Sequence, residues 1–196
     1  MKNSILLGTG NTGKLKEIRF YLEHFHIFQG LKTLTPSNFK DLGEPVENGM
    51  TFEENAKLKS NFFFKATNIL SLSDDSGLIV KKFSNYPGIK TARVAKDLGG
   101  EQKVIDYIFS KFVNETHLEA TFHCAVALIG NGKNFVCSGK VKGSIIPMRR
   151  GSKGFGYDPY FIPENNLKTF AEMSIEEKML LSHRFDAFKI LANQML

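Results

Sequence analysis

The segment that decides the fold is SILLGTGNTGK, residues 4–14. Its first part, Ser4–Thr9, has the apolar run of a short buried strand, and Gly10–Gly13 has the composition of a turn. The residues that follow, Lys14–His24, place apolar side chains at the spacing of a helix. A strand that leads through a glycine-rich turn into a helix is typical of the start of an α/β domain.

The rest of the chain predicts further strands and helices in a mixed order. Thr51 and Glu54 have the spacing of a capping box, which indicates the start of a long helix that reaches about Leu70. Asn131-Gly132 between two apolar runs is typical of a β-hairpin. The predicted fold class is α/β, with a mixed central β-sheet flanked by helices, in a single domain spanning residues 1–196. We further expect strands at 31–34, 70–73, 78–80, 120–129 and 134–141, and helices at 101–112 and 182–196.

The composition indicates a folded protein with an anionic partner. Hydrophobic residues make up 42% of the chain, and 26 Lys and Arg against 20 Asp and Glu give a net charge of +6. A positive balance suits a nucleotide or a nucleic acid. No stretch approaches the roughly 18 apolar residues of a membrane span, and the apolar run after Met1 is too short for a signal peptide. We therefore expect a cytoplasmic protein with no membrane partner, in which Cys124 and Cys137 are reduced thiols.

The glycine-rich turn fits two nucleotide-binding motifs incompletely. It matches G-x-G-x-x-G, but Phe28, Gln29 and Gly30 occupy the region about 20 positions later where a dinucleotide-binding fold has an acidic residue. It also matches G-x-x-x-x-G-K, but Leu15 stands where that loop has the Ser or Thr that holds Mg²⁺. Backbone N–H groups and Lys14 could still bind a triphosphate, with the metal held by carboxylates elsewhere. The alternative is a tight turn with no ligand.

Two adjacent acids, Asp74 and Asp75, lie between apolar runs in what the sequence predicts to be a turn. Burying a carboxylate is costly unless it is paired or binds a metal. Either acid could hold Mg²⁺ or orient the water molecule that phosphoryl transfer to water requires. Glu44 and Glu47, just before the long helix, are the other acids placed to reach a metal. The alternative for each acid is an ordinary solvated position in a turn or loop.

Aromatic and basic residues near the C-terminus predict contacts with a nucleotide base. Phe155 and Tyr157 lie in a glycine-rich loop, where either ring could stack on a base. His183 and Arg184 begin the last helix and could donate hydrogen bonds to a purine carbonyl oxygen. The alternatives are rings that fix the loop to the core, solvent-facing positions for His183 and Lys178, and a surface salt bridge for Arg184.

Five motifs in one order carry a family resemblance: Thr9–Lys14, Thr51–Ala56, Asp74–Gly77, Gly154–Pro159 and Ser182–Arg184. Together they resemble the inosine triphosphate pyrophosphatase family, and the match covers essentially the whole chain. The resemblance implies a nucleoside triphosphate pyrophosphatase that hydrolyses ITP, dITP and XTP to the monophosphate and pyrophosphate. Such an enzyme removes deaminated purines from the nucleotide pool. The resemblance also implies a homodimer, and an elongated mixed sheet with a cleft between two lobes.

The resemblance further implies roles for individual residues. Asp75 is the implied catalytic residue, and it binds Mg²⁺ together with Glu47. Glu44 is left open as an alternative to Glu47, and Asp74 could share the activation of water. The implied substrate-binding residues are Thr9, Gly10, Asn11, Thr12, Gly13, Lys14, Lys59, Ser76, Phe155, Gly156, Tyr157, Asp158, Lys178, His183 and Arg184.

In the expected reaction, a water molecule attacks the α-phosphorus and pyrophosphate leaves. His183 and Arg184 would favour 6-oxo purines, because adenine presents an amino donor that leaves these donors unpaired. One alternative is a pyrophosphatase for other modified nucleotides. Another, from a different class, is a basic nucleic-acid-binding protein. That alternative does not explain the acids at Asp74 and Asp75, so we expect no nucleic-acid partner.

Overall fold

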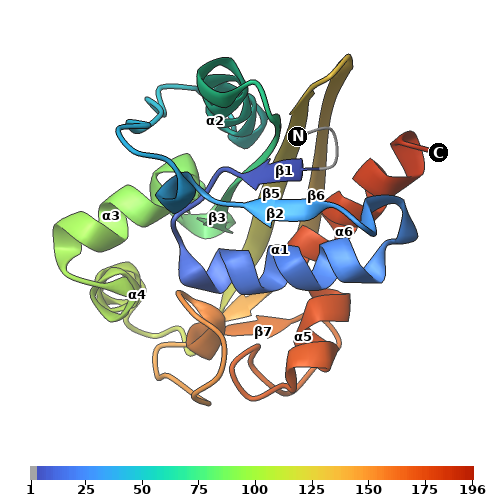
Figure 1. Ribbon diagram of the computed structural model, residues 1–196. Helices are drawn as coiled ribbons and strands as arrows, with labels where there is room; N and C mark the ends of the chain where they lie inside the picture. Colours follow the sequence, from blue (N-terminus) through green and yellow to red (C-terminus); the bar gives the residue numbers. More distant parts are fainter. Residues whose placement is uncertain (1–3) are drawn as a thin grey trace. The chain divides into compact units, whose positions relative to one another are not determined.

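The computed structural model of the protein describes residues 4–196, in which strands and helices are interspersed along the chain (Figure 1). The strands are β1 (Ser4–Leu7), β2 (Lys32–Leu34), β3 (Leu70–Val80), β4 (Tyr86–Pro87), β5 (Leu118–Gly130), β6 (Lys133–Ile145) and β7 (Phe161–Pro163). The α-helices are α1 (Thr12–His24), α2 (Phe52–Thr67), α3 (Thr91–Leu98), α4 (Glu101–Ser110), α5 (Ile175–Leu181) and α6 (His183–Gln194). The chain therefore has the predicted α/β class.

The strands form a mixed sheet, as predicted. Their order is β2-β1-β3-β5-β6-β7, and β4 pairs with β3 outside this path. β1 is parallel to both of its neighbours, with Ile5 opposite Thr33 on β2 and opposite Leu70 on β3. β4 is antiparallel to β3, and β7 is antiparallel to β6. The parallel pairs belong to the strand–helix–strand units at the start of the chain, which the glycine-rich turn predicted.

The chain divides into two compact units. Unit 1 comprises the described residues up to Asp75, together with Cys124–Gly139 and the residues from His183 onward. Unit 2 comprises Ser76–His123 and Lys140–Ser182. The cleft between two lobes and the single functional domain stay predictions.

Unit 1 is built around β1, whose residues Ile5, Leu6 and Leu7 are fully buried. α1 and α2 lie on opposite sides of β1 and β2 (Figure 1). Gly8 ends β1 in a crowded position, because a Cβ atom there would lie 2.2 Å from Ser73 Oγ and 2.5 Å from the Phe63 ring. The first glycine of the predicted loop is therefore required for close packing of the strand against its neighbours.

Unit 2 has its own apolar core, in which aromatic rings contribute much of the volume. Phe122 and Phe161 have ring centroids 4.4 Å apart, and Phe161 and Phe170 have centroids 5.3 Å apart. Val104, Ile105 and Ile108 of α4 are fully buried in the same cluster. This core lies beneath the Gly-rich loop that contains Phe155 and Tyr157, since Tyr157 belongs to the cluster.

The predicted acidic turn is wrong: β3 runs without interruption from Leu70 to Val80, straight through Asp74 and Asp75. The prediction failed because two adjacent carboxylates normally oppose burial in a strand. Here both are nevertheless almost fully buried, with exposed fractions of 1% and 6%. Cations from the surrounding helices neutralise them, as described below, and this compensation is not visible in the local sequence.

The other element predictions are mostly confirmed, within a few residues at their ends. The β5–β6 hairpin turns at Asn131 and Gly132, both with positive φ, as a two-residue turn of this kind requires. Ser174 and Glu177 form the second capping box of the chain. Thr51 caps α2 by accepting from the Glu54 N–H, while the Glu54 carboxylate accepts from the Met50 N–H.

Two further expectations concern the thiols and the membrane. Cys124 and Cys137 are both free and buried, as expected. Burial raises the pKa of the Cys124 thiol to about 12, so this side chain stays neutral. Within residues 4–196, no helix is both long and apolar enough to cross a bilayer.

Candidate active site

Side chains of the glycine-rich loop form hydrogen bonds within the loop and with the start of α1. Asn11 caps α1, since its Oδ1 accepts from the Lys14 N–H at 3.0 Å. Thr9 Oγ1 in turn accepts from the Asn11 N–H at 3.2 Å. A Cβ atom at Gly10 would meet no other atom within 4 Å, so the space above the loop is open. The loop thus presents a fixed helix N-terminus to open space, which is the geometry that binds phosphate groups.

Asp74 is a single carboxylate shared between two cations. Its Oδ2 lies 3.0 Å from Lys14 Nζ and 3.0 Å from Arg184 Nη2. Arg184 also pairs through Nη1 with Glu17, which is buried on α1. Burial by itself would raise the pKa of Asp74, but Lys14, Arg184 and Lys59 outweigh it and hold this pKa well below its usual value. Asp74 is therefore a permanent anion that ties α1 and α6 to β3.

Asp75 has the opposite arrangement, in which two carboxylates share one cation. Lys59 Nζ lies 3.4 Å from Asp75 Oδ1 and 3.2 Å from Glu47 Oε1. Asn55 Nδ2 donates to Asp75 Oδ2 at 3.0 Å. Burial raises the pKa of Asp75, and Lys59, Lys14 and Asn55 oppose this effect without reversing it. Burial by itself would lower the pKa of Lys59, but Asp75, Asp74 and Glu47 raise it, so this ammonium stays charged.

The chemistry of these oxygens fits a magnesium ion. Asp75 and Glu47 converge on the same ammonium, and the Glu47 side chain remains 42% exposed to solvent. Mg²⁺ characteristically binds one or two protein carboxylates and completes its shell with phosphate oxygens and water. A cage of three or more His, Cys, Asp and Glu residues does not occur in the part of the chain that the structure describes. The pair Asp75 and Glu47 matches in number the one or two carboxylates that proteins supply to Mg²⁺.

The loop of unit 2 that contains Phe155 is fixed by interactions with the Asp158 carboxylate. The Phe155 N–H donates to Asp158 Oδ2 at 2.7 Å, and Lys178 pairs with the same carboxylate. Lys178 Nζ lies 4.8 Å from the centroid of the Phe155 ring. Gly154 has a φ of +72°, and a Cβ atom there would lie 2.0 Å from Asp158 Oδ2. The loop therefore closes tightly around the Asp158 carboxylate, and Phe155 is presented half-buried.

The basic residues near the C-terminus do not face solvent, so the solvent-facing alternatives are wrong. Lys178, His183 and Arg184 have exposed fractions of 6%, 6% and 1%. Arg184 has carboxylate partners at two of its nitrogens, as described above. Ser76 is half-buried on β3. Tyr157 is buried, and this burial raises the pKa of its hydroxyl group.

The structure brings part of the predicted set together within each unit. In unit 1, the glycine-rich loop, Lys14 and Arg184 are linked through Asp74, and Lys59 and Glu47 are linked to Asp75. In unit 2, Phe155, Asp158 and Lys178 are in direct contact.

Sequence reasoning missed two buried polar residues in unit 1, Glu17 and Asn55. Glu17 has an exposed fraction of 3% and holds Arg184, while Asn55, also 3% exposed, holds Asp75. The position of each residue on its helix is a sequence signal that could have identified it. Glu17 lies on α1 next to Ile18 and one turn before Tyr21, on its apolar side. Asn55 lies one turn before Lys59, on the same side of α2.

The sequence matches the Ham1 family over residues 5–194. It is 36% identical over 198 residues to the dITP/XTP pyrophosphatase of Aquifex aeolicus, covering 96% of this chain and 95% of that protein. It is 37% identical over 193 residues to the dITP/XTP pyrophosphatase of Bacillus anthracis, covering 95% and 93% of the two chains.

Solved structures give the same result for the fold. The Staphylococcus aureus Ham1 protein superposes with a TM-score of 0.84 at 34% identity, covering 98% of this chain and 97% of that one. A nucleoside-triphosphatase, or dITP/XTP pyrophosphatase, from Mycobacterium abscessus superposes with a TM-score of 0.73 at 33% identity, covering 96% and 97% of the two chains. With a family match and relatives that extend over nearly its whole length, this chain belongs to the Ham1 family.

Proposed function

We propose that this protein hydrolyses the non-standard purine nucleoside triphosphates dITP, XTP and ITP to the nucleoside monophosphate and pyrophosphate. The observation that carries the proposal is the pair of carboxylates, Asp75 and Glu47, that share Lys59. An open phosphate-binding loop in the same unit supports it. The names of the relatives, dITP/XTP pyrophosphatase, point to the same substrates.

Asp75 and Glu47 would hold Mg²⁺ together with oxygens of the triphosphate. The metal would neutralise charge on the triphosphate and make the phosphorus more electrophilic. Asp75 then orients the attacking water and accepts its proton; of the two adjacent carboxylates, it is the one that shares its cation with a second acid, Glu47. Asp74 is a poor base, since Lys14 and Arg184 hold its pKa well below the usual value.

Cations around the loop stabilise the charge that develops as pyrophosphate leaves. Lys14 lies in the first turn of α1, and the loop just before it is open at Gly10, where a Cβ atom would meet no other atom within 4 Å. Lys59 is charged, and its ammonium would be a second cation able to bind phosphate oxygens. Preorganised positive groups of this kind supply most of the catalysis in phosphoryl transfer.

Residues nearer the C-terminus would bind the nucleoside. Phe155 presents a half-buried ring for stacking on a base, and Lys178 and Asp158 hold the loop around it. Gly156 and Tyr157 complete this loop, and Ser76, His183 and Arg184 would provide further contacts. A 6-oxo purine satisfies donors that adenine leaves unpaired, at a cost of about 1–3 kcal/mol for each buried donor.

A product assay with a substrate panel tests the proposal. Purified protein and Mg²⁺ are incubated with dITP, XTP, ITP, ATP and GTP, and pyrophosphate and orthophosphate are measured separately. We expect pyrophosphate from the first three substrates and much slower release from ATP and GTP. Orthophosphate as the sole product would contradict cleavage at the α-phosphorus, and equal rates with ATP would contradict the selectivity.

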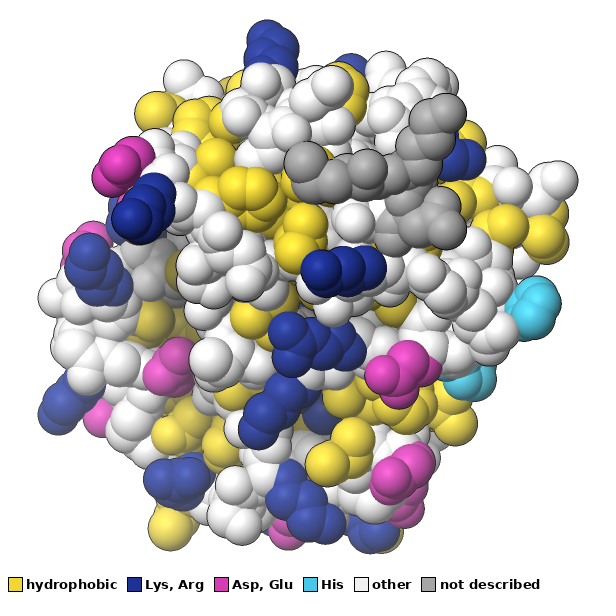
Figure 2. All heavy atoms as spheres, in the orientation of Figure 1, with side chains coloured by type: hydrophobic (Ala, Val, Ile, Leu, Met, Phe, Trp, Pro, Cys, Tyr) yellow, Lys and Arg dark blue, Asp and Glu magenta, His cyan; other side chains and the backbone are white. Residues whose placement is uncertain are grey.

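We further propose that the enzyme is a cytoplasmic homodimer without nucleic-acid or membrane partners. Lys and Arg side chains spread over the face in Figure 2, with acidic and hydrophobic side chains between them. Binding to single-stranded or double-stranded DNA should therefore be weak and lost at moderate salt. Sedimentation velocity and a DNA-binding titration measure the two claims. A monomer at micromolar concentration, or tight salt-resistant binding, would contradict them.

A further inference from the structure

Asn55 connects the Asp75 carboxylate to the loop that carries Glu47. Its Nδ2 donates to Asp75 Oδ2 at 3.0 Å, and its Oδ1 accepts from the Gly49 N–H at 2.8 Å. The side chain has an exposed fraction of only 3%. One amide therefore bonds both to the proposed catalytic carboxylate and to the segment that follows the other proposed metal ligand by two residues.

The chemistry of the two partners leaves little choice of residue at this position. A backbone N–H can only donate, and an ionised carboxylate can only accept. The residue between them must present an acceptor to one and a donor to the other, which an amide does. Asp would present a second carboxylate to Asp75, and an aliphatic side chain would remove one hydrogen bond from each of the two partners.

The loop approaches α2 so closely that side chains are excluded at Gly49. A Cβ atom there would lie 2.7 Å from Asn55 Oδ1 and 2.8 Å from Glu54 Cβ. The next N–H, of Met50, donates to Glu54 Oε2 at 2.7 Å. Two successive backbone N–H groups are thus bound by side chains of the first turn of α2, and this fixes where the chain leaves Glu47.

We propose that Asn55 is a positioning residue that sets the separation of Asp75 and Glu47, and with it the geometry of the magnesium site. The inference rests on the proposed function, in which these two carboxylates hold the metal. Asn55 contacts neither substrate nor metal in this account. It acts by fixing the orientation of Asp75 and the position of the loop at the same time, as hydrogen-bond partners of metal ligands commonly do.

Two substitutions separate the two bonds of Asn55. Asn55→Ala removes both the donor and the acceptor. Asn55→Asp keeps the acceptor for the Gly49 N–H but replaces the donor to Asp75 with a like charge. Asn61→Ala is the matched control, because Asn61 is a half-buried residue of the same type on the same helix. All variants are compared for thermal stability, so that unfolding is distinguished from loss of position.

Three quantities are measured: the dissociation constant for Mn²⁺ used in place of Mg²⁺, hydrogen exchange at the Gly49 amide, and kcat with XTP. We expect Asn55→Ala to weaken Mn²⁺ binding and to lower kcat, each by about 10–100-fold, and to accelerate exchange at Gly49. We expect Asn55→Asp to lower kcat similarly while Gly49 exchange stays close to that of the unmodified protein. Asn61→Ala should change none of the three by more than about twofold.

A purely structural role would give a different result. If Asn55→Ala lowers the melting temperature but leaves Mn²⁺ affinity and kcat per folded molecule within about twofold, the inference is overturned. It is also overturned if the unmodified protein has no saturable Mn²⁺ site. If that protein binds Mn²⁺ but hydrolyses none of dITP, XTP and ITP, the proposed function fails instead. Mn²⁺ affinity and Gly49 exchange then still decide the role of Asn55.

Discussion

Asp74 and Asp75 are adjacent residues on one strand, yet their surroundings are reversed. Asp74 is one carboxylate between two cations, Lys14 and Arg184. Asp75 and Glu47 are two carboxylates that share one cation, Lys59. Successive side chains of a strand point to opposite faces of a sheet, so Asp74 meets cations from α1 and α6, and Asp75 meets residues of α2. Asp74 thus has two cations against its own carboxylate, whereas Asp75 shares its one cation with a second acid, and this difference assigns the two residues different tasks.

The difference explains how a buried strand can carry two charges. The pKa of Asp74 is held well below its usual value, so its negative charge stabilises the fold. The pKa of Asp75 is raised, so its negative charge costs stability and is available to a divalent cation or to a proton. Carboxylates whose pKa values are shifted in this way cluster at functional sites.

The largest expected effect is on catalysis at Asp75. Asp75→Asn should lower kcat with XTP by about 10²–10⁴-fold, because it removes the group that accepts the proton of water. The melting temperature should stay the same or rise, since a neutral side chain relieves the burial that raises the pKa of Asp75. Steady-state kinetics and a thermal melt measure the two quantities. Retained turnover would move the base to another residue.

Asp74→Asn should give the reverse pattern, a large loss of stability. The substitution leaves Lys14 and Arg184 without their shared carboxylate, and breaking a buried pair costs about 3–5 kcal/mol. Urea unfolding at neutral pH measures the change in the free energy of unfolding. If Asp74→Asn lowers the free energy of unfolding by less than Asp75→Asn does, the proposed difference between the two residues is wrong.

The stability difference between the unmodified protein and Asp74→Asn should depend on pH. The folded-state pKa of Asp74 lies below its ordinary value of 3.8. Its contribution is therefore fully present above that value, and it is lost as the pH falls further toward the folded-state pKa. Unfolding curves should show about the same stability difference between the two proteins at pH 7 and pH 4, and a smaller difference at pH 3. A constant difference would mean that the Asp74 charge is not the source of the stabilisation.

The next effect in size concerns the choice between Glu47 and Glu44. Glu47→Gln should raise the Mg²⁺ concentration needed for half-maximal rate by about tenfold, the lower end of the range for residues that support a metal. The structure favours Glu47 because its carboxylate lies 3.2 Å from Lys59 Nζ. Glu44→Gln is the control, and it should leave the Mg²⁺ requirement unchanged. A larger increase in the Mg²⁺ requirement for Glu44→Gln than for Glu47→Gln would make Glu44 the second metal ligand.

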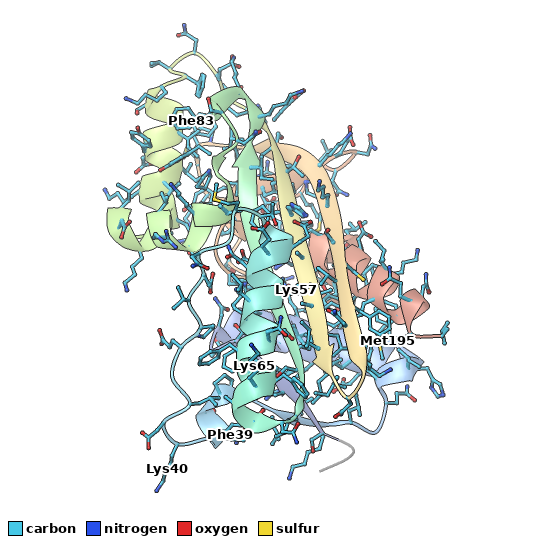
Figure 3. All side chains as sticks on the ribbon, turned by 90° about the horizontal axis from the view of Figure 1, so that it is seen from above. Phe39, Lys40, Lys57, Lys65, Phe83 and Met195 are labelled. Atoms are coloured by element: carbon cyan, nitrogen blue, oxygen red, sulfur yellow. The ribbon has the colours of Figure 1, made fainter. Side chains whose placement is uncertain are left out.

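The smallest predicted effect comes from an exposed lysine of α2, Lys57, compared with buried Lys59. Lys59→Met should lower kcat through loss of a charge near the phosphates, whereas Lys57→Met should have an effect within about 0.5 kcal/mol on stability and none on activity. Both residues belong to α2, but Lys59 is buried and Lys57 is exposed. Figure 3 looks onto α2 and marks Lys57 and Lys65 on it. Equal losses for the two substitutions would indicate a general charge effect.

Local signals predicted much of the fold. The glycine-rich turn predicted the start of α1, and Asn131-Gly132 predicted the β5–β6 hairpin, because the conformations of such turns depend on the residues within them. The prediction of a turn at the acidic stretch failed because the conformation there depends on distant residues. Whether Asp74 and Asp75 continue a strand depends on cations from α1, α2 and α6, which are distant in the sequence.

The candidate site also contains residues that the sequence predicts and residues that it does not. Motif residues such as Lys14 and Asp75 were predicted, because phosphate and metal chemistry limits which residue types can serve. Glu17 lies outside the five motifs, and Asn55 lies within Thr51–Ala56 but was given no role. Each acts on another side chain that only folding brings near, Arg184 and Asp75 respectively. A buried polar residue on the apolar side of a helix is the signal that would have found them.

The most direct test of the account is the position of bond cleavage. XTP is hydrolysed with Mg²⁺ in water enriched in ¹⁸O, and the products are analysed by mass spectrometry. Attack of water on the α-phosphorus places one ¹⁸O in the nucleoside monophosphate and none in pyrophosphate, and this is the result we predict. Label in pyrophosphate, with an unlabelled monophosphate, would mean attack at the β-phosphorus and would contradict the proposed reaction.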